Sequence, residues 1–323
     1  MMRAVRVAEF GGPEVLQWVE LPRPIPGPGE LLVQVEAAGL NFIDTYHRIG
    51  IYPMDLPFTL GLEGAGTIVE IGEGVGDFIT GQRVAWASAS GSFAEFVAVP
   101  ALAAVHIPDS VPHDIAAAVM LQGMTAHYLA KDTYPLDPGE KCLIHAGAGG
   151  VGLLLIQIAK LCGAEVFATV STDEKVTLAT EAGADHVIKY TEVDFVGAVE
   201  SIIGPKALDV VYDGVGAATF DKGLGLLRPR GLMALFGQSS GVVEPFDLGK
   251  LARFGSLYVT RPSLFAYIAE RPDLERRAAD VFNWIAAGEL DVRIGARFPM
   301  SQVEAAQRAL EGRETTGKVL LEP

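Results

Sequence analysis

Cysteine is scarce in this chain, because only Cys142 and Cys162 occur among its 323 residues. Two thiols cannot build a four-cysteine zinc site, and they do not form the disulfide framework of a small secreted protein. Basic residues are also in deficit, with 25 Lys and Arg against 40 Asp and Glu and a formal net charge of -15. A surface of this sign repels a phosphate backbone, so we expect no nucleic-acid partner.

Long uncharged apolar runs are missing as well. No stretch predicts the ~20-residue helix that crosses a bilayer, and the first residues lack the apolar segment of a signal peptide. We therefore expect a cytoplasmic protein without a membrane partner. Hydrophobic residues still make up 50% of the chain and charged residues 20%, which allows a sizeable core. A chain of this length predicts about two domains.

The spacing of glycine, proline and apolar residues along the chain predicts an α/β protein with two kinds of domain architecture. In the first third, short apolar runs are separated by glycine and proline, which indicates a small, irregular β-barrel. Strands then alternate with helices, which predicts a doubly wound parallel sheet. We expect its strands at 141–145, 165–170, 186–189, 209–212, 232–236 and 256–260, its helices at 150–161, 173–182, 193–203 and 219–227, and in the tail helices near 273–287 and 303–310 and a strand at 318–321.

A glycine-rich segment, Gly147-Ala148-Gly149-Gly150-Val151-Gly152, matches the G-x-G-x-x-G pattern. It follows an expected buried strand and opens an expected helix, which is the context that makes the pattern informative. Glycines permit the tight turn and let backbone N–H groups approach a pyrophosphate, whose charge the helix N-terminus stabilises. The segment therefore predicts a dinucleotide site; the alternative is a purely structural glycine turn.

The end of the second expected strand indicates which dinucleotide binds. NAD sites usually carry Asp or Glu there, whereas this chain has the neutral Ser171, followed within about one turn by Lys175. A 2′-phosphate fits this pair, so we predict NADPH, with Tyr190 beside the adenosine. Two observations keep the question open: Thr172 can simply cap a helix, and Asp173 can bind a ribose.

Six separated motifs carry a family resemblance. They are 41–46 (Asn-Phe-Ile-Asp-Thr-Tyr), 50–53 (Gly-Ile-Tyr-Pro), 61–66 (Gly-Leu-Glu-Gly-Ala-Gly), 81–84 (Gly-Gln-Arg-Val), 145–152 (His-Ala and the glycine segment) and 258–264 (Tyr-Val-Thr-Arg-Pro-Ser-Leu). Together they resemble the medium-chain dehydrogenase/reductase superfamily, and more closely its zinc-free quinone oxidoreductase branch, related to zeta-crystallin. The resemblance covers essentially the whole chain.

The chain departs from the zinc alcohol dehydrogenases of that superfamily at the metal ligands. Asn41 matches the ligating Cys and Leu62 the ligating His, and neither residue type replaces them on zinc. The lobe with four zinc-binding cysteines is also missing. We therefore expect no metal.

The resemblance implies a GroES-like catalytic domain (1–123 and 265–323), a Rossmann NADPH-binding domain (124–264) and an active site in the cleft between them. It also implies a homodimer, and the expected edge strand 256–260 favours pairing with its copy. The implied cofactor contacts are Asn41, Phe42 and Tyr128 at the nicotinamide half, Gly147, Ala148, Gly149, Gly150 and Val151 at the pyrophosphate, Ser171, Thr172, Lys175 and Tyr190 at the adenosine phosphate, the loop residues Gly237, Gln238, Ser239, Pro262, Ser263 and Leu264, and Arg313 from the tail. For Arg313 the alternative is a solvated arginine at a helix end.

Without zinc, a conjugated acceptor suits the site, because it accepts hydride readily once it is aligned. We therefore predict an NADPH-dependent quinone reductase. Asn41 is a candidate hydrogen-bond partner of the cofactor or the substrate oxygen, and Tyr46 and Tyr52 are candidate walls or proton donors, with packing alone as the alternative. Two other activities stay open: an enone, enal or enoyl-thioester reductase in which Tyr52 donates the proton, and a non-catalytic NADPH-binding protein of the crystallin type.

Overall fold

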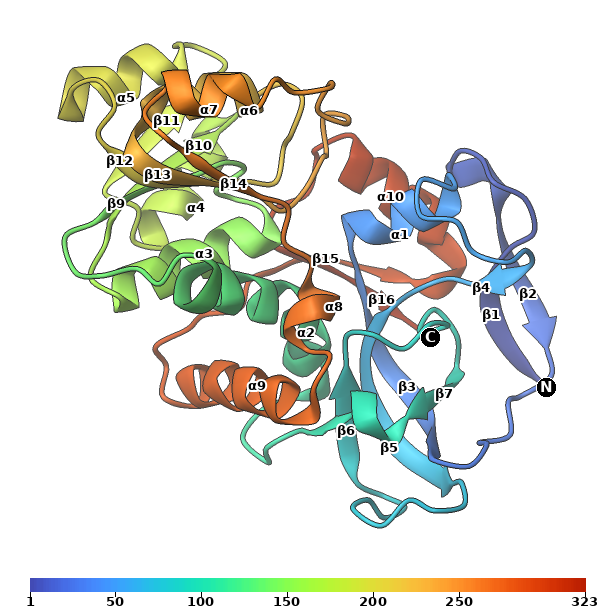
Figure 1. Cartoon of the computed structure of the whole chain (residues 1–323). Helices are drawn as coiled ribbons and strands as arrows, with labels where there is room; N and C mark the ends of the chain where they lie inside the picture. Colours follow the sequence, from blue (N-terminus) through green and yellow to red (C-terminus); the bar gives the residue numbers. More distant parts are fainter. The chain divides into compact units, whose positions relative to one another are not determined.

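A computed structural model describes all 323 residues. The chain forms two compact units. The first unit comprises residues 1–124 and 268–323, so it is built from both parts of the chain that flank the second unit, residues 125–267. Figure 1 traces this order from the blue N-terminal strands through the green and yellow second unit to the red C-terminal segment.

Two sheets make the β structure of the first unit. A small sheet has the order β2-β1-β4, with β2 at Leu16–Leu21, β1 at Met2–Val7 and β4 at Phe58–Thr59. The larger sheet has the order β15-β16-β3-β5-β6-β8, and β7 also pairs with β3. Its strands are β15 (Ile294–Pro299), β16 (Lys318–Glu322), β3 (Glu30–Leu40), β5 (Glu63–Ile71), β6 (Arg83–Trp86), β7 (Phe96–Pro100) and β8 (Val105–His106).

Alternation of side chains between the faces of these strands builds one apolar core. Buried Leu31 and Val33 of β3 belong to the same cluster as Ile68 of β5 and Trp86 of β6. The C-terminal β16 runs antiparallel to β3, with Leu320 opposite Gly39. The helices of this unit are α1 (Phe42–Arg48), α9 (Arg271–Ala286) and α10 (Val303–Glu311). The first of its two segments ends within α2 (His113–Tyr128).

The second unit is a parallel six-stranded sheet in the order β11-β10-β9-β12-β13-β14. Its helices α3 and α4 contact each other, as do α5 and α6, and Figure 1 shows the two pairs on opposite sides of the sheet. The strands are β9 (Lys141–Ile144), β10 (Glu165–Val170), β11 (His186–Lys189), β12 (Leu208–Asp213), β13 (Leu227–Leu235) and β14 (Tyr258–Thr260), and the helices are α3 (Gly150–Leu161), α4 (Asp173–Glu181), α5 (Phe195–Ile203), α6 (Phe220–Leu226), α7 (Gly249–Arg253) and α8 (Leu264–Tyr267).

The predicted α/β class and the doubly wound sheet are confirmed, and several elements differ from expectation, among them helices α2, α7 and α8, which were not predicted. Helix α1 lies in the part of the chain that we predicted as β. The sequence did not reveal this helix because seven residues are too few to show a helical period. Strand β13 begins earlier than expected, since the polar run Arg228-Pro229-Arg230 at its start conceals it. Strand β15, parallel to β16, was not predicted.

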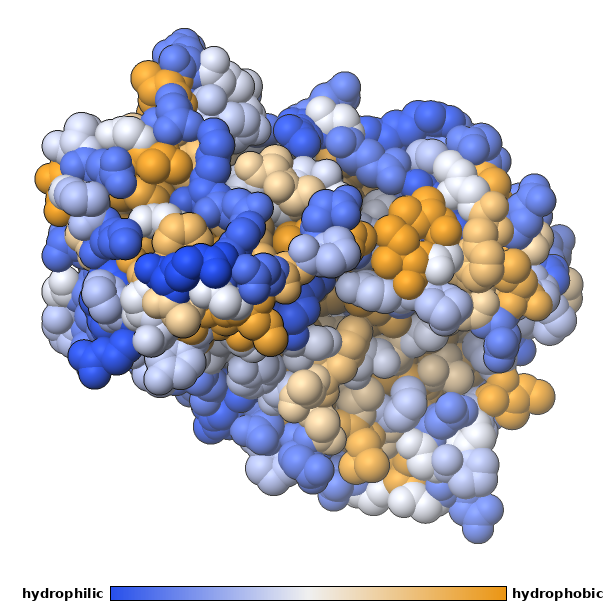
Figure 2. All heavy atoms as spheres, turned by 45° about the horizontal axis from the view of Figure 1, so that its top comes forward, coloured by the Kyte–Doolittle hydropathy of each residue, from blue (hydrophilic) through white to orange (hydrophobic).

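Apolar residues on the outside are dispersed. The face drawn in Figure 2 is mostly hydrophilic, with hydrophobic groups in separate patches. Ile25, Leu102 and Leu248 are among the most exposed hydrophobic side chains. None of the helices combines the length and the apolar character that crossing a bilayer requires.

Candidate nucleotide and substrate sites

The glycine segment forms the loop between β9 and α3, as predicted. The N–H group of Gly147 donates to the carbonyl oxygen of Thr169 at 3.0 Å, and that of Gly149 to the carbonyl oxygen of Ala146 at 2.9 Å. A Cβ atom added at Gly152 would lie 2.3 Å from the Ala146 oxygen, a distance that real Cβ atoms do not adopt. Glycine at this position therefore lets α3 begin directly against the loop.

The start of α3 is open to an anion. Gly149 is the N-cap residue and offers no side chain to the first N–H groups of the helix, and the first turn has no acidic residue. A helix N-terminus carries partial positive charge and unpaired N–H donors, so it stabilises a phosphate close to the backbone. This 12-residue helix with its glycine loop thus fits the pyrophosphate of a dinucleotide.

Most of the other predicted cofactor residues follow the carboxyl ends of neighbouring strands. Ser171 comes directly after β10, Tyr190 after β11, and Gly237 and Pro262 shortly after β13 and β14. In a parallel sheet these ends share one edge, and ligands bind there. The structure therefore brings these residues to the same edge as the glycine loop, together with Gln238, Ser239, Ser263 and Leu264.

Thr172 caps α4, since its hydroxyl accepts a hydrogen bond from the Lys175 N–H at 3.3 Å. The expected cap at Thr172 is therefore present, and it places Lys175 one turn into the helix. Asp173 does not stand alone, because the ammonium of Lys189 lies 2.5 Å from its carboxylate. The hydrogen bonds that Lys189 donates to Asp173 and Glu192 raise the pKa of Lys189. The positive charge of Lys189 therefore offsets the carboxylate of Asp173, the residue that favours NAD over NADPH.

The sequence interpretation missed Lys189, although it ends a strand that leads to the predicted site. It also assigned no role to His145 and Asp213 at the same sheet edge. The His145 ring nitrogen Nδ1 lies 2.9 Å from the Thr169 hydroxyl, and burial lowers the pKa of this histidine. Buried Asp213 accepts hydrogen bonds from the N–H groups of Val215 and Gly216 at 2.7 and 3.0 Å. These side chains fix the loops beside the glycine segment.

Tyr128 lies at the end of α2, buried, with its ring stacked on that of Tyr267 at a centroid distance of 4.1 Å. The hydroxyl of Tyr267 is 2.8 Å from that of Thr133. Arg313 lies in the first unit, after α10, with a positive φ of 61°. The second unit therefore contains most of the predicted cofactor residues, whereas Asn41, Phe42 and Arg313 belong to the first.

In the first unit, the predicted substrate residues gather around α1. The rings of Tyr46 and Tyr52 meet edge to face at 5.6 Å, and Phe42 and Tyr46 lie 6.4 Å apart. His47 lies 6.2 Å from Tyr52. We call Phe42, Tyr46, His47 and Tyr52 the aromatic group of α1. Flat aromatic rings with hydroxyl groups suit a planar, polar-edged ligand.

A buried polar cluster that the sequence interpretation missed lies at the N-terminal end of α1. The ammonium of Lys318 on β16 contacts the carboxylate of Glu63 on β5, and both side chains are almost fully buried. Lys318 also donates to Asn41 Oδ1 at 2.9 Å. The other Glu63 oxygen accepts the Leu121 N–H at 2.6 Å. Burial lowers the pKa of Lys318, while its contact with Glu63 acts in the opposite direction.

Asn41 uses every hydrogen-bonding position of its side chain inside this cluster. Its Nδ2 group donates to Glu63 Oε2 at 2.8 Å and to the Gly39 carbonyl at 3.1 Å. Its Oδ1 atom accepts from Lys318 and, at 3.1 Å, from Gln122. An amide has two donor hydrogens and two acceptor lone pairs. The predicted bond from Asn41 to cofactor or substrate therefore requires one of these partners to give way.

Asp44 completes the polar surroundings of Asn41. Its carboxylate accepts the backbone N–H of Asn41 at 2.7 Å, which ties the first turn of α1 to the residue before it. Burial raises the pKa of Asp44 to about 7 against the opposing effect of that hydrogen bond.

Asn41 and Leu62, which stand at the positions of zinc ligands in the zinc alcohol dehydrogenases, are not arranged around a metal. Leu62 is buried, and Asn41 is occupied by its four partners. No group of three or more His, Cys, Asp or Glu side chains is placed to hold a metal ion. Cys142 and Cys162 are free thiols, and burial raises the pKa of both.

Two family models match the chain: the alcohol dehydrogenase GroES-like domain over residues 27–109 and the zinc-binding dehydrogenase model over residues 150–280. Among curated proteins, Escherichia coli quinone oxidoreductase 1 is 43% identical and the Pseudomonas aeruginosa quinone oxidoreductase 42% identical, each match covering 100% of both chains. The 2-haloacrylate reductase of a Burkholderia species is 38% identical over 100% of this chain and 99% of its own.

Solved structures agree with these relatives. The Escherichia coli quinone oxidoreductase complexed with NADPH has a TM-score of 0.97 and 42% identity, covering 99% of this chain and 100% of that one. A mycobacterial protein complexed with NADPH has a TM-score of 0.97 and 46% identity over 100% of both chains. The chain belongs to the medium-chain dehydrogenase/reductase superfamily, in its quinone oxidoreductase family.

Proposed function

We propose that this chain is an enzyme that reduces quinones with NADPH. The observation that carries the proposal is the glycine loop with its uncapped helix α3, in a chain that matches quinone oxidoreductases over their full length. Two of the matched structures contain NADPH. The residues present fit this cofactor, since α3 offers free N–H donors and Lys189 neutralises the acid near the expected 2′-phosphate.

Each part of the second unit has a task in this proposal. The backbone of the glycine loop and the first turn of α3 bind the pyrophosphate. Ser171 and Lys175 bind the 2′-phosphate, Tyr190 flanks the adenosine, and the loops after β13 and β14 line the remaining edge of the sheet. NADPH, when bound, supplies the reducing equivalents, and the protein contributes orientation and exclusion of water.

The aromatic group of α1 forms the proposed wall for the acceptor. A quinone is planar, so it can lie against the rings of Tyr46 and Tyr52, and either hydroxyl can donate a proton to a reduced oxygen. The Tyr52→Phe variant removes one hydroxyl and keeps the ring. A fall in kcat with an unchanged KM supports proton donation by Tyr52, and unchanged turnover leaves Tyr52 only as part of the wall.

The direct test of the function is NADPH oxidation with a panel of acceptors, run with and without a metal chelator. We expect 1,4-benzoquinones to be reduced at the same rate in both conditions. Loss of activity with the chelator contradicts a metal-free site. Tight binding of NADPH with no acceptor turned over contradicts catalysis and favours the crystallin-like alternative.

A second activity is supported by one particular relative. The full-length match to a 2-haloacrylate reductase shows that the same framework occurs in a protein named for reducing a conjugated acid. Tyr52 would then protonate the reduced double bond. Comparison of enals, enones and 2-haloacrylates with quinones at saturating NADPH distinguishes the two activities by their kcat/KM values.

We also propose a homodimer that joins through β14. This strand is the last in the order of its sheet, and Tyr258 is 60% exposed. An open sheet edge with exposed large side chains favours pairing with a second copy. Sedimentation at micromolar concentration should show a dimer, and Val259→Lys should convert it to monomer. A wild-type monomer overturns the proposal.

A further inference from the structure

Helix α1 is too short to hold its own direction. It has seven residues, and isolated helices of fewer than about 12 residues are marginal in water. Its direction in the protein must therefore come from tertiary contacts, and because α1 carries three members of the aromatic group, these contacts also set the position of the proposed substrate wall.

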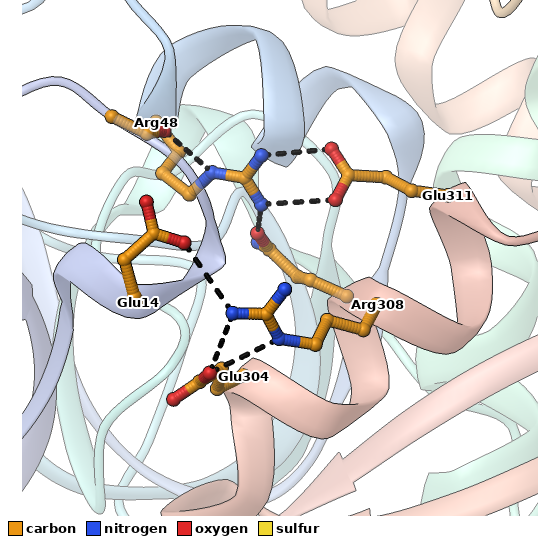
Figure 3. Close-up of polar contacts among 7 residues, drawn as sticks. Glu14, Arg48, Glu304, Arg308 and Glu311 are labelled. Carbon is orange, nitrogen blue, oxygen red and sulfur yellow. Dashed lines mark hydrogen bonds and ion pairs between the residues drawn. The ribbon is translucent and has the colours of Figure 1, made fainter.

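At the C-terminal end of α1, these contacts are made by the buried guanidinium group of Arg48. Arg48 is the last residue of α1, and its side chain is 2% exposed. Its Nη2 group lies 2.7 Å from Glu311 Oε1, and Nη1 donates to Gln307, both on α10. Its Nε group donates to the Gly11 carbonyl at 3.1 Å, while the Gly11 N–H donates back to the Arg48 carbonyl at 3.2 Å. Figure 3 shows Arg48 turned toward Glu311.

The position of Tyr52 depends on the same contacts of Arg48. Its backbone N–H donates to the Tyr46 carbonyl at 3.3 Å, and its ring contacts that of Tyr46. Between them, Gly50 has a φ of 78° and lies against the Phe10 ring, since an added Cβ there would be 3.0 Å from that ring. A shift at Arg48 therefore moves both tyrosines.

We propose that Arg48, together with Gln307 and Glu311, is a positioning residue for the quinone, because it fixes the direction of α1 and with it Tyr46 and Tyr52. This inference rests on the proposed quinone reduction. Arg48 itself need not touch substrate or cofactor, because all three of its nitrogen groups already have partners in the protein. Its effect reaches the substrate through the backbone of α1.

The same helix α10 provides a matched control. Arg308 lies 2.8 Å from Glu304 and 3.4 Å from Glu14, and its side chain is 54% exposed. Figure 3 shows Arg308 on α10 near Arg48, but the ion pairs of Arg308 involve no residue of α1. Arg308→Met therefore removes an arginine and its ion pairs from α10 without releasing α1.

The test compares Arg48→Met, Glu311→Gln and Arg308→Met by steady-state kinetics with a benzoquinone and NADPH. We expect Arg48→Met to raise the KM for the quinone about tenfold with the KM for NADPH unchanged, and Glu311→Gln to raise it about threefold. The double variant should be no worse than Arg48→Met alone, since both changes break one anchor. Arg308→Met should stay within twofold of wild type.

Equal changes in Arg48→Met and Arg308→Met, or a rise in both KM values together, overturn the inference, because a general loss of stability then accounts for the effect. If Arg48→Met does not fold, Glu311→Gln carries the test, since Glu311 is 34% exposed and Arg48 keeps its hydrogen bonds to Gln307 and Gly11 in that variant.

Deuterium exchange of the peptide 42–52 makes the inference separable from the proposed function. Arg48→Met should increase exchange there at least fivefold, and Arg308→Met should not. If the wild-type chain reduces no quinone, the proposed function fails, and unchanged exchange in Arg48→Met shows independently that Arg48 does not position α1.

Discussion

The proposed sites of the two units differ in the groups that form them, backbone groups in the second unit and side chains in the first. In the second unit the proposed pyrophosphate site consists of backbone: glycines, one helix N-terminus and the ends of parallel strands. In the first unit the surroundings of the proposed wall contain two charged pairs, Lys318 with Glu63 and Arg48 with Glu311, in which every side chain except that of Glu311 is buried. Backbone donors keep their charge distribution at any pH, whereas a buried charge depends on its partner. The first unit should therefore respond more strongly to single side-chain changes.

The largest effect is expected when a buried cation is removed from the first unit. Lys318→Met leaves the Glu63 carboxylate buried without its counter-charge, which typically costs about 3–5 kcal/mol of unfolding free energy. The measurement is urea unfolding followed by tryptophan fluorescence, because Trp18, Trp86 and Trp284 all belong to the first unit.

Two variants sharpen the Lys318 result. Adding Glu63→Gln to Lys318→Met should recover part of the loss, because the carboxylate charge is then gone. Lys222→Met breaks an exposed pair with Asp194 in the second unit and should cost only about 0–1 kcal/mol. An equal loss in Lys318→Met and Lys222→Met would remove the distinction between the units.

The next effect concerns pH. The pKa of Asp44 is raised from 3.8 to about 7 by burial, so the folded protein keeps a proton that the unfolded chain releases between these values. The free energy of unfolding therefore falls as pH rises from about 4 to 7, by up to roughly 4 kcal/mol for one such group. Asp44→Asn should abolish this part of the fall when urea unfolding is measured at several pH values.

The control for Asp44 is the exposed Asp77 of the same unit, where Asp77→Asn should leave the pH profile as it is. Identical profiles for wild type and Asp44→Asn show that the buried carboxyl does not retain its proton.

In the second unit a comparable effect needs a change of backbone geometry. Gly152→Ala places a Cβ atom against the Ala146 carbonyl, so the loop must move away from its position at α3. We expect the Kd for NADPH to rise about 100-fold, or about 2.7 kcal/mol, measured by calorimetry. Gly225→Ala in α6 meets no atom within 4 Å and is the control. Unchanged binding in Gly152→Ala contradicts the role of the loop.

The smallest effect is expected at the one charged side chain assigned to the cofactor phosphate. Lys175→Met should weaken NADPH binding about tenfold, or about 1.4 kcal/mol, and leave NADH within twofold. The pair is measured by fluorescence titration, with Lys222→Met as the control for loss of positive charge in the same unit. Equal weakening of both cofactors is evidence against a 2′-phosphate at Lys175.

The contrast between the units also explains what the sequence could predict. The alternating strands and helices of the second unit have local patterns, and Gly147 to Gly152 form a motif with fixed spacing. The parallel sheet and its loop were therefore predicted, with the largest difference at β13, which begins at Leu227 instead of residue 232. Helix α1 was not, because seven residues show no period.

The polar contacts of the first unit have no local pattern. Lys318 and Glu63 are 255 residues apart in the chain, and Arg48 and Gln307 are 259 apart. Each residue alone resembles a surface charge, so only the folded structure brings the pairs together. Asn41 is an example: the sequence named it as a candidate hydrogen-bond partner of cofactor or substrate, but not the four partners of its amide.

The return of β16 to β3 also sets an order for folding during synthesis. A ribosome adds roughly 5–20 residues per second, and domains fold as they emerge. All strands of the second unit exist once Thr260 has been made, whereas Glu63 waits for Lys318. The nascent first unit therefore carries an unneutralised carboxylate at Glu63 and an unpaired edge on β3 until the last residues of the chain have been made.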